Sequence, residues 1–541
     1  MVTQEILTIQ LGHYANFVGT HWWNIQETNF SYDPLNPSEI NSDVLYREGE
    51  LQKNITYTPR LLIADLKGAF GYLSEEGNLL DVFQTDNQAP EILWEENRLE
   101  IAKRPTANKS PFIQSLEKAA SSEENITYDL ENETNTWVDY LVPRFHARTI
   151  NVINEYEHGS RDQPFDIFSY GQNLWKTNNF SEDFTDKIRA YAEECNLMQG
   201  FQVLVDADDG FGGLAASLIQ YLKDEYGKSI ITWPVFDSSH RDPTQSDNIK
   251  LINTVLLWHQ LGEYSSLFSP LCCGTDGWPT PGAPRIFNHV TYKADLKYHT
   301  SALLATAVDT LSLRYRNKRY PMSVLSDICA DLGKFGRKAV ATSLSLPFPI
   351  FSNQDLIDML DDLDGSCPWT SLTPRCNISV DNVMQSLALR GISEKRLKGP
   401  MQESNEQIKK FAYKCSSVHE MMSLYLDSTC HFSASHLTNI EQVLKVNDPY
   451  PKLFNSNIME DGSLSKKLRM EEIKSVPVMA GLHTGKFMSK MYDSLYKGVE
   501  QKVRSLRRFN AFILSGLEED EFKESVNDLL NCKDNYEERD I

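Results

Sequence analysis

The clearest pattern of apolar and polar positions runs from residue 196 to residue 226. Residues 200–205 form an apolar run with β-branched side chains, which predicts a buried strand. Apolar residues then recur at helical spacing over 214–222, and an Asp- and Gly-rich turn over 206–213 separates the two. A strand, a glycine-rich turn and a helix in this order form the layout in which backbone N–H groups bind a phosphate.

The turn itself carries the wrong charge for a phosphate. Asp206, Asp208 and Asp209 crowd its entrance. A carboxylate at ~4 Å repels a phosphate charge by about 1 kcal/mol in water and by severalfold more near a protein surface. The pattern therefore indicates a nucleotide-binding scaffold whose loop chemistry disfavours a nucleotide.

Further segments of the chain alternate between the two periodicities. Strands are predicted at residues 4–10, 232–236 and 340–351, and helices at 18–25, 182–195, 253–261 and 299–314. The last of these helices is predicted to be followed by a strand.

Several of these segments resemble one superfamily. Residues 198–202 (MQGFQ), the glycine-rich turn and the helix ending in KDEY resemble the corresponding stretch of tubulin and FtsZ. Residues 4–23 resemble tubulin's opening strand, loop and first helix, and residues 57–68 resemble its next strand and nucleotide loop. Residues 507–536 resemble tubulin's last two helices. The departures match one branch, and the chain is identified as a member of the misato family of tubulin-related proteins.

The resemblance implies an α/β fold of the tubulin/FtsZ type. A Rossmann-like parallel-sheet domain is expected over residues 1–284, an α/β intermediate domain over 285–450 and a C-terminal helical region over 451–541. The first domain is longer than tubulin's because of an insertion at about 74–161. Acidic and amide-rich composition predicts a mobile loop within it, at about 107–135.

The same resemblance implies a vestigial nucleotide site. The matching positions are Gly12, His13, Asp65, Gly171, Asn173, Asp206, Asp208, Gly210, Gly212 and Gly213. His13 stands where tubulins have a Gln that helps to hold the nucleotide and its magnesium. It either hydrogen-bonds a phosphate or only caps and packs. Residues 271–282, where the base-reading residues are expected, instead predict a loop.

Asp331 is the one catalytic candidate. It lies in C-A-D-L, residues 329–332, which resembles the N-A-D-L of tubulin, whose acid acts on the nucleotide of a neighbouring subunit. The spacing to Pro347-Phe348-Pro349, similar to tubulin's V-P-F-P, is several residues too long. An exposed helix Asp is the alternative interpretation.

Cysteine and histidine spacing predicts no metal site. Nine cysteines are scattered without a C-x-x-C pair, which is typical of reduced thiols. Cys272 and Cys273 are adjacent but lack a second ligand pair. Cys430, His431 and His436 match no common zinc spacing.

Charge and hydropathy exclude several classes of function. The net charge of −22 argues against nucleic-acid binding and against broad attraction to anionic lipid. No apolar run approaches the roughly 20 residues of a membrane helix, and residues 1–11 resemble no presequence. Motifs of serine hydrolases, zinc proteases, kinases and Walker-type NTPases are absent from the sequence.

Three hypotheses about function remain. The first is a non-enzymatic protein that acts through partners; the misato resemblance implies a role in mitochondrial distribution, morphology and inheritance. Its expected location is the cytoplasm and the cytosolic face of the mitochondrial outer membrane, with no cofactor. The second is a factor for tubulin folding or microtubule and spindle assembly, with tubulin and the cytosolic chaperonin as partners. The third is an active GTPase in which Asp65, Asp206 or Asp208 holds Mg²⁺ beside GTP.

Overall fold

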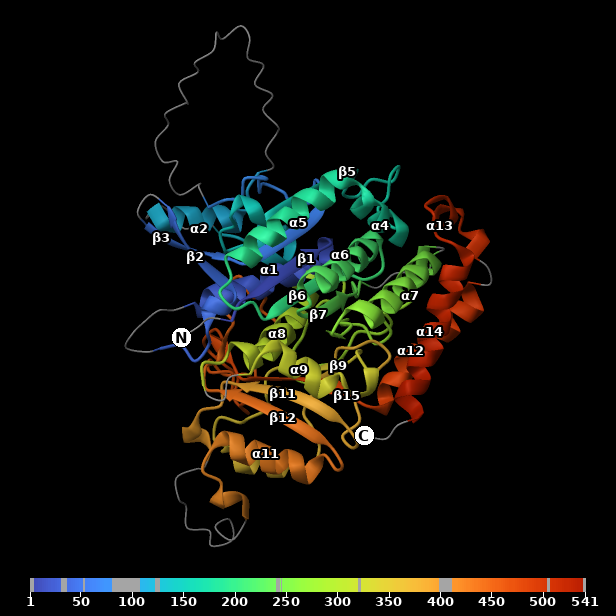
Figure 1. The fold of residues 1–541 in the computed structure, drawn as a ribbon. Coiled ribbons are helices and arrows are strands. Elements are labelled where there is room, and N and C mark those ends of the chain that lie inside the picture. Colours follow the sequence, from blue (N-terminus) through green and yellow to red (C-terminus); the bar gives the residue numbers. More distant parts are fainter. Residues whose placement is uncertain are drawn as a thin grey trace.

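The first half of the chain builds a parallel sheet of six strands in the order β5-β4-β1-β6-β7-β8 (Figure 1). The computed structural model describes residues 4–30, 37–51, 54–79, 108–121, 127–239, 244, 246–319, 323–397, 411–503 and 506–538. The strands are β1 (Ile6–Leu11), β4 (Leu61–Lys67), β5 (Ile150–Glu157), β6 (Gly200–Asp206), β7 (Ser229–Val235) and β8 (Leu267–Phe268).

Helices cover both faces of this sheet. β1 and β6 are buried at every residue, which explains why the sequence shows continuous apolar runs there instead of alternation. One face packs against α1 (His13–Asn29) and α8 (Lys297–Arg316). The other face packs against α4 (Phe168–Lys176), α5 (Asn178–Glu193), α6 (Gly210–Tyr226) and α7 (Ser246–Tyr264).

A second, mixed sheet follows in the lower part of Figure 1. Its strand order is β10-β9-β15-β11-β12, and β11 and β12 are its parallel pair. The strands are β9 (Ala341–Ser345), β10 (Thr370–Ser371), β11 (Met384–Arg390), β12 (Ala434–Ile440) and β15 (Val478–Thr484). The helices α10 (Leu356–Asp362) and α11 (Val418–Thr429) pack on one side of it. α8 contacts β11 and β15, so it lies between the two sheets.

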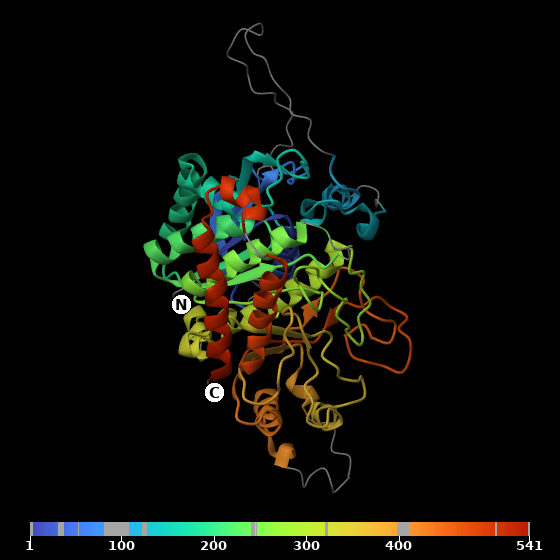
Figure 2. The same cartoon turned by 90° about the vertical axis from the view of Figure 1, so that its right-hand side faces the viewer.

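The C-terminal helices form an outer layer against α7, in red at the front of Figure 2. They are α12 (Ser489–Lys502), α13 (Asn510–Leu514) and α14 (Glu519–Glu538). His259 of α7 and Asp528 of α14 pair at 2.5 Å. Among the described residues, no helix has both the length and the apolar character needed to cross a bilayer.

The smaller elements complete the described chain. They are the hairpin of β2 (Tyr46–Leu51) and β3 (Asn54–Pro59), the pair β13 (Leu444–Lys445) and β14 (Ser475–Val476), the helices α2 (Pro111–Ser121), α3 (Leu130–Glu133) and α9 (Leu325–Leu332), and the 3₁₀ turn η4 (Trp137–Tyr140).

Three local predictions differ from the structure. The strand predicted over 340–351 ends at Ser345. Among the described residues, no strand comes directly after residue 314, because α8 continues to Arg316. This helix is buried nearly all round, so its sequence lacks the amphipathic stripe that marks a surface helix. The loop predicted at 107–135 contains α2, whose Phe112 and Ile113 are buried. Residues 80–107 and 122–126 of the insertion lie outside the described residues.

Candidate functional site

The predicted site residues converge mainly where the strand order reverses. From β1 the chain adds β4 and β5 on one side, then returns to add β6, β7 and β8 on the other. The carboxyl ends of β1 and β6 therefore flank the switch point at which α/β sheets bind ligands. Gly12 follows β1 and precedes α1, and residues 207–209 connect β6 to α6.

Asp206 occupies the N-terminal end of α1, where an anion would otherwise bind. The backbone N–H groups of Tyr14 and Ala15, in the first turn of α1, donate to its two carboxylate oxygens at 3.0 and 2.7 Å. Gly12 has a φ of 112°, and a Cβ added there would lie 2.5 Å from the Asp206 carboxyl carbon. Only glycine allows this close approach. The anion position at the start of α1 is thus filled by the chain's own side chain.

The protonation of Asp206 is unusual as a result. Burial raises the pKa of Asp206 to about 7, the two backbone hydrogen bonds oppose the rise, and nearby Asp208 and Asp65 add to it. The folded protein therefore keeps this proton over a range of pH in which the unfolded chain has lost it.

This shift predicts a pH-dependent contribution to stability. The contribution is fully present below about pH 4 and is lost as the pH rises through about 7. In Asp206→Asn the position no longer titrates. As the pH rises across that window, the difference in free energy of unfolding between this variant and wild type should shift in favour of the variant by up to about 1.4 kcal/mol per pH unit. Urea denaturation at several pH values measures the difference, and a difference independent of pH would contradict the assignment.

The other two acids of the turn also have partners within the chain. Asp209 caps α6, because its carboxylate accepts the backbone N–H of Phe211 at 2.9 Å. Burial raises the pKa of Asp209 well above its ordinary value, with Asp206 and Asp208 adding to the rise. Asp208 forms an ion pair with Lys250 of α7.

The glycines of the turn permit helix packing. A Cβ on Gly171 would lie 1.9 Å from the carbonyl oxygen of Gly210, and one on Gly213 would lie 1.8 Å from that of Phe168. α4 therefore rests directly on the first turns of α6. Gly212 differs, because a Cβ there would meet its nearest neighbours at 3.5 and 3.6 Å, an ordinary van der Waals distance.

Gly171 and Asn173 do not form the loop that the tubulin resemblance implies. Both lie within α4, whose Phe168, Gly171 and Leu174 are buried at helical spacing. The Asn173 side-chain amide donates to the carbonyl of Ser515 at 2.9 Å, toward the C-terminal helices. The structure thus brings together the other nine predicted nucleotide-binding positions without Asn173.

Asp65 is fully buried at the carboxyl end of β4 and accepts several hydrogen bonds. Asn16 Nδ2 and Trp137 Nε1 each donate to its Oδ2 at 3.0 Å, and the backbone N–H of Leu66 donates to Oδ1 at 2.8 Å. His13 Nδ1 lies 3.3 Å from the same Oδ2. Burial alone would raise the pKa of Asp65, but the contacts with His13, Asn16 and Leu66 lower it below its ordinary value.

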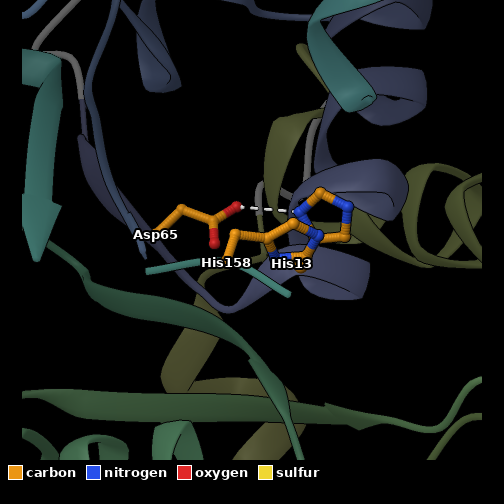
Figure 3. Close-up of side chains that lie close together, drawn as sticks. All are labelled: His13, Asp65 and His158. Carbon is orange, nitrogen blue, oxygen red and sulfur yellow. Dashed lines mark hydrogen bonds and ion pairs between the residues drawn. The ribbon is translucent and has the colours of Figure 1, made fainter. Parts of the chain in front are cut away.

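His158 completes a cluster with His13 and Asp65 (Figure 3). It directly follows β5 and is exposed, and its ring centroid lies 4.0 Å from that of His13. One ligand atom from each of the three side chains lies within 4.8 Å of the others. Sequence reasoning missed both His158 and Trp137, which reach Asp65 from the predicted insertion. The apolar residues at 137, 138, 140 and 141 are the signal in the sequence that could have pointed to a buried segment there.

Asp331 lies at the other end of the sheet. It is on α9, whose Leu325 backbone N–H donates to the Gln199 side chain just before β6. Its side chain is half exposed and forms an ion pair with Arg314 of α8. The structure therefore separates Asp331 from the nine clustered positions.

The predicted loop over residues 271–282 contains buried thiols. Cys272 and Cys273 are both fully buried, and burial raises the pKa of the Cys272 thiol to about 12. Both cysteines are free, and the Cys272 thiol is neutral at physiological pH.

Comparison with known proteins places this geometry in a family. A family model described as the Misato Segment II tubulin-like domain matches residues 4–118, and one described as a tubulin domain matches residues 129–317. Protein misato of Drosophila melanogaster is 35% identical over 99% of this chain and 98% of its own length. The chain belongs to the misato family. Protein misato homolog 1 is 33% identical in Mus musculus and 32% in Homo sapiens, over 99% of this chain and 98% of each relative.

Misato membership and the tubulin-like α/β fold were both predicted from the sequence and are confirmed. The Misato Segment II model ends at residue 118, within α2. It therefore covers residues 74–118, the first part of the predicted insertion.

Proposed function

We propose that this misato-family chain is a non-enzymatic, tubulin-related protein that regulates mitochondrial distribution, morphology and inheritance. It acts through protein partners, in the cytoplasm and at the cytosolic face of the mitochondrial outer membrane. It uses neither GTP nor Mg²⁺ as a cofactor. The mitochondrial part of the proposal rests on the family resemblance.

The contact between Asp206 and the start of α1 is the main support for the non-enzymatic part of the proposal. The N–H groups of Tyr14 and Ala15 are the donors that a nucleotide phosphate would need, and both are bonded to a carboxylate. A phosphate entering there has to displace Asp206 and lie beside Asp208 and Asp209. The residues present therefore fit a nucleotide phosphate poorly.

The packing of α4 on α6 supports the same conclusion. Tubulin-type phosphate binding needs open backbone at the glycine-rich turn, and here the backbone of α4 lies against Gly210 and Gly213. Gly171 and Gly213 serve helix packing, which is compatible with a chain that does not bind the nucleotide.

A role in tubulin folding or microtubule and spindle assembly is the second candidate, with tubulin and the cytosolic chaperonin as partners. The observation that favours it is the outer layer of C-terminal helices (Figure 2). α14 begins with Glu519, Asp520 and Glu521, and the Asp520 side chain is 92% exposed. This acidic helix start is a surface for a basic partner.

A paired experiment tests the non-enzymatic proposal. We expect calorimetric titration of the full chain with GTP, with and without Mg²⁺, to show no submicromolar binding. We also expect Asp208→Asn, which removes a candidate Mg²⁺ ligand at a partly exposed site, to restore mitochondrial distribution in depleted cells as well as wild type does. Tight GTP binding with turnover would establish the GTPase instead, and a folded Asp208→Asn protein that fails to rescue would count against the non-enzymatic proposal.

The same cells separate the two candidate roles. Depletion should disturb mitochondrial distribution while microtubule mass stays normal, and loss of microtubules as the earlier defect would favour the tubulin role. Asp520→Lys reverses charge on the exposed start of α14. Loss of tubulin or chaperonin co-purification in this variant would identify the partner surface.

A further inference from the structure

The proposed function assigns no role to the cluster of His13, Asp65 and His158 (Figure 3). We propose that these three side chains form an open binding site for Zn²⁺ or a similar divalent transition-metal ion. The site uses two of the predicted nucleotide-binding positions, His13 and Asp65, but does not depend on a bound nucleotide.

The three ligands come from neighbouring strands of the sheet. His13 follows β1 after a single glycine, Asp65 lies in β4, and His158 directly follows β5. These strands are adjacent, in the order β5-β4-β1, and parallel. Their carboxyl ends therefore present the three groups side by side. The backbone N–H of His158 donates to the carbonyl of Lys67 at 2.9 Å, which ties its segment to the end of β4.

The donor set identifies the class of ion. Two imidazole nitrogens and one carboxylate oxygen suit Zn²⁺ and other first-row transition metals. Mg²⁺ prefers oxygen ligands and retains several waters, so two histidines disfavour it. The cluster is thus unlike the oxygen-rich site that a magnesium–nucleotide complex needs.

Asp65 is already held as a metal-binding carboxylate should be. Asn16 and Trp137 donate to Oδ2 and the Leu66 N–H donates to Oδ1, so the carboxylate is fixed from its buried side. Such outer contacts orient a ligand and are needed for full metal affinity. His158 is exposed, which provides an entry path from solvent. An open zinc site with three protein ligands takes water in its fourth position.

Metal binding requires a small adjustment. Ligand atoms around a tetrahedral ion with bonds of about 2.0–2.1 Å lie roughly 3.4 Å apart. His13 Nδ1 and Asp65 Oδ2 are already 3.3 Å apart, and all three ligand atoms lie within 4.8 Å. The ligand nitrogen of His158 has to move by about an ångström toward the other two ligand atoms. Its exposed position beside Gly159, whose φ is 75°, allows this.

Cobalt titration of the full chain tests the proposal. We expect one Co²⁺ to bind, with visible d–d bands of a nitrogen- and oxygen-coordinated ion and no thiolate-to-cobalt charge transfer, and Zn²⁺ to displace it. His158→Ala should weaken Co²⁺ binding at least tenfold, since it removes a direct ligand from an exposed position. His419→Ala, an exposed histidine on α11, is the matched control and should bind as wild type does.

A second variant tests the hydrogen bonds that orient Asp65. Trp137→Phe keeps an aromatic side chain, although a smaller one, and removes the indole N–H that donates to Asp65; it should weaken Co²⁺ binding by about 10-fold or more. Thermal unfolding of each variant without metal checks that it folds. Wild-type Co²⁺ affinity in His158→Ala, thiolate charge transfer, or no binding to wild type would each overturn the proposal.

Discussion

Replacing Asp309 by alanine should lower the free energy of unfolding by about 3–5 kcal/mol. Asp309 lies on α8, between the two sheets, and is fully buried. One carboxylate oxygen accepts from Arg316 and from the Gln26 side chain, each at 2.7 Å, and the other pairs with Arg390 of β11. Both arginines are almost completely buried. Removing the acid leaves two guanidinium charges without their anion in the interior.

Another acid that pairs with an arginine of α8 provides the control. Asp331 pairs with Arg314, but its side chain is half exposed, and Arg314 also donates to Ser386 and Ser323. Asp331→Ala should therefore cost at most about 1 kcal/mol. Urea denaturation of the two variants measures both values. Similar losses would mean that burial does not set the importance of these pairs.

The Asp309 contacts explain why the two sheets form one unit. Gln26 belongs to α1 under the first sheet, Arg316 ends α8, and Arg390 belongs to the second sheet. A single carboxylate thus joins three elements that are far apart in the sequence. No periodicity in the chain identifies these partners, because the pairing depends on the tertiary position of each side chain.

The parts of the fold predicted from the sequence are those with a local cause. β1 and β6 were predicted because strands buried on both faces must be apolar throughout. The helix after residue 213 was predicted from its apolar spacing and the glycine at 227, which adopts the left-handed conformation of a helix end. The misato resemblance added the tubulin-like α/β fold class.

The parts that were missed depend on contacts between distant segments. The sequence shows three acids in the turn after β6 and predicts repulsion of a phosphate, but not that Asp206 bonds to the start of α1. Trp137 and His158 reach Asp65 from segments far from it in the sequence. Gly171 and Asn173 resembled nucleotide-site positions of tubulin, whereas Phe168 and Leu174 place them in a helix once α6 is beside them.

Gly213→Ala should also be strongly destabilising, by about 2–3 kcal/mol. Its Cβ would lie 1.8 Å from the Phe168 carbonyl oxygen, so α4 has to move away from α6 as a rigid backbone. Gly212→Ala adds the same methyl group one residue earlier, where the neighbours are 3.5 Å away or more. We expect its free energy of unfolding to stay within about 0.5 kcal/mol of wild type.

The comparison of these two alanines also bears on what the glycine-rich turn is for. If it still served mainly to bring backbone N–H groups to a phosphate, the two glycines would matter through ligand binding, and both apo proteins would unfold like wild type. If it serves helix packing, only Gly213→Ala is destabilised, and no nucleotide is needed to see the effect. Denaturation without any ligand therefore separates the two explanations. The backbone of α4 against Gly210 and Gly213 predicts the second.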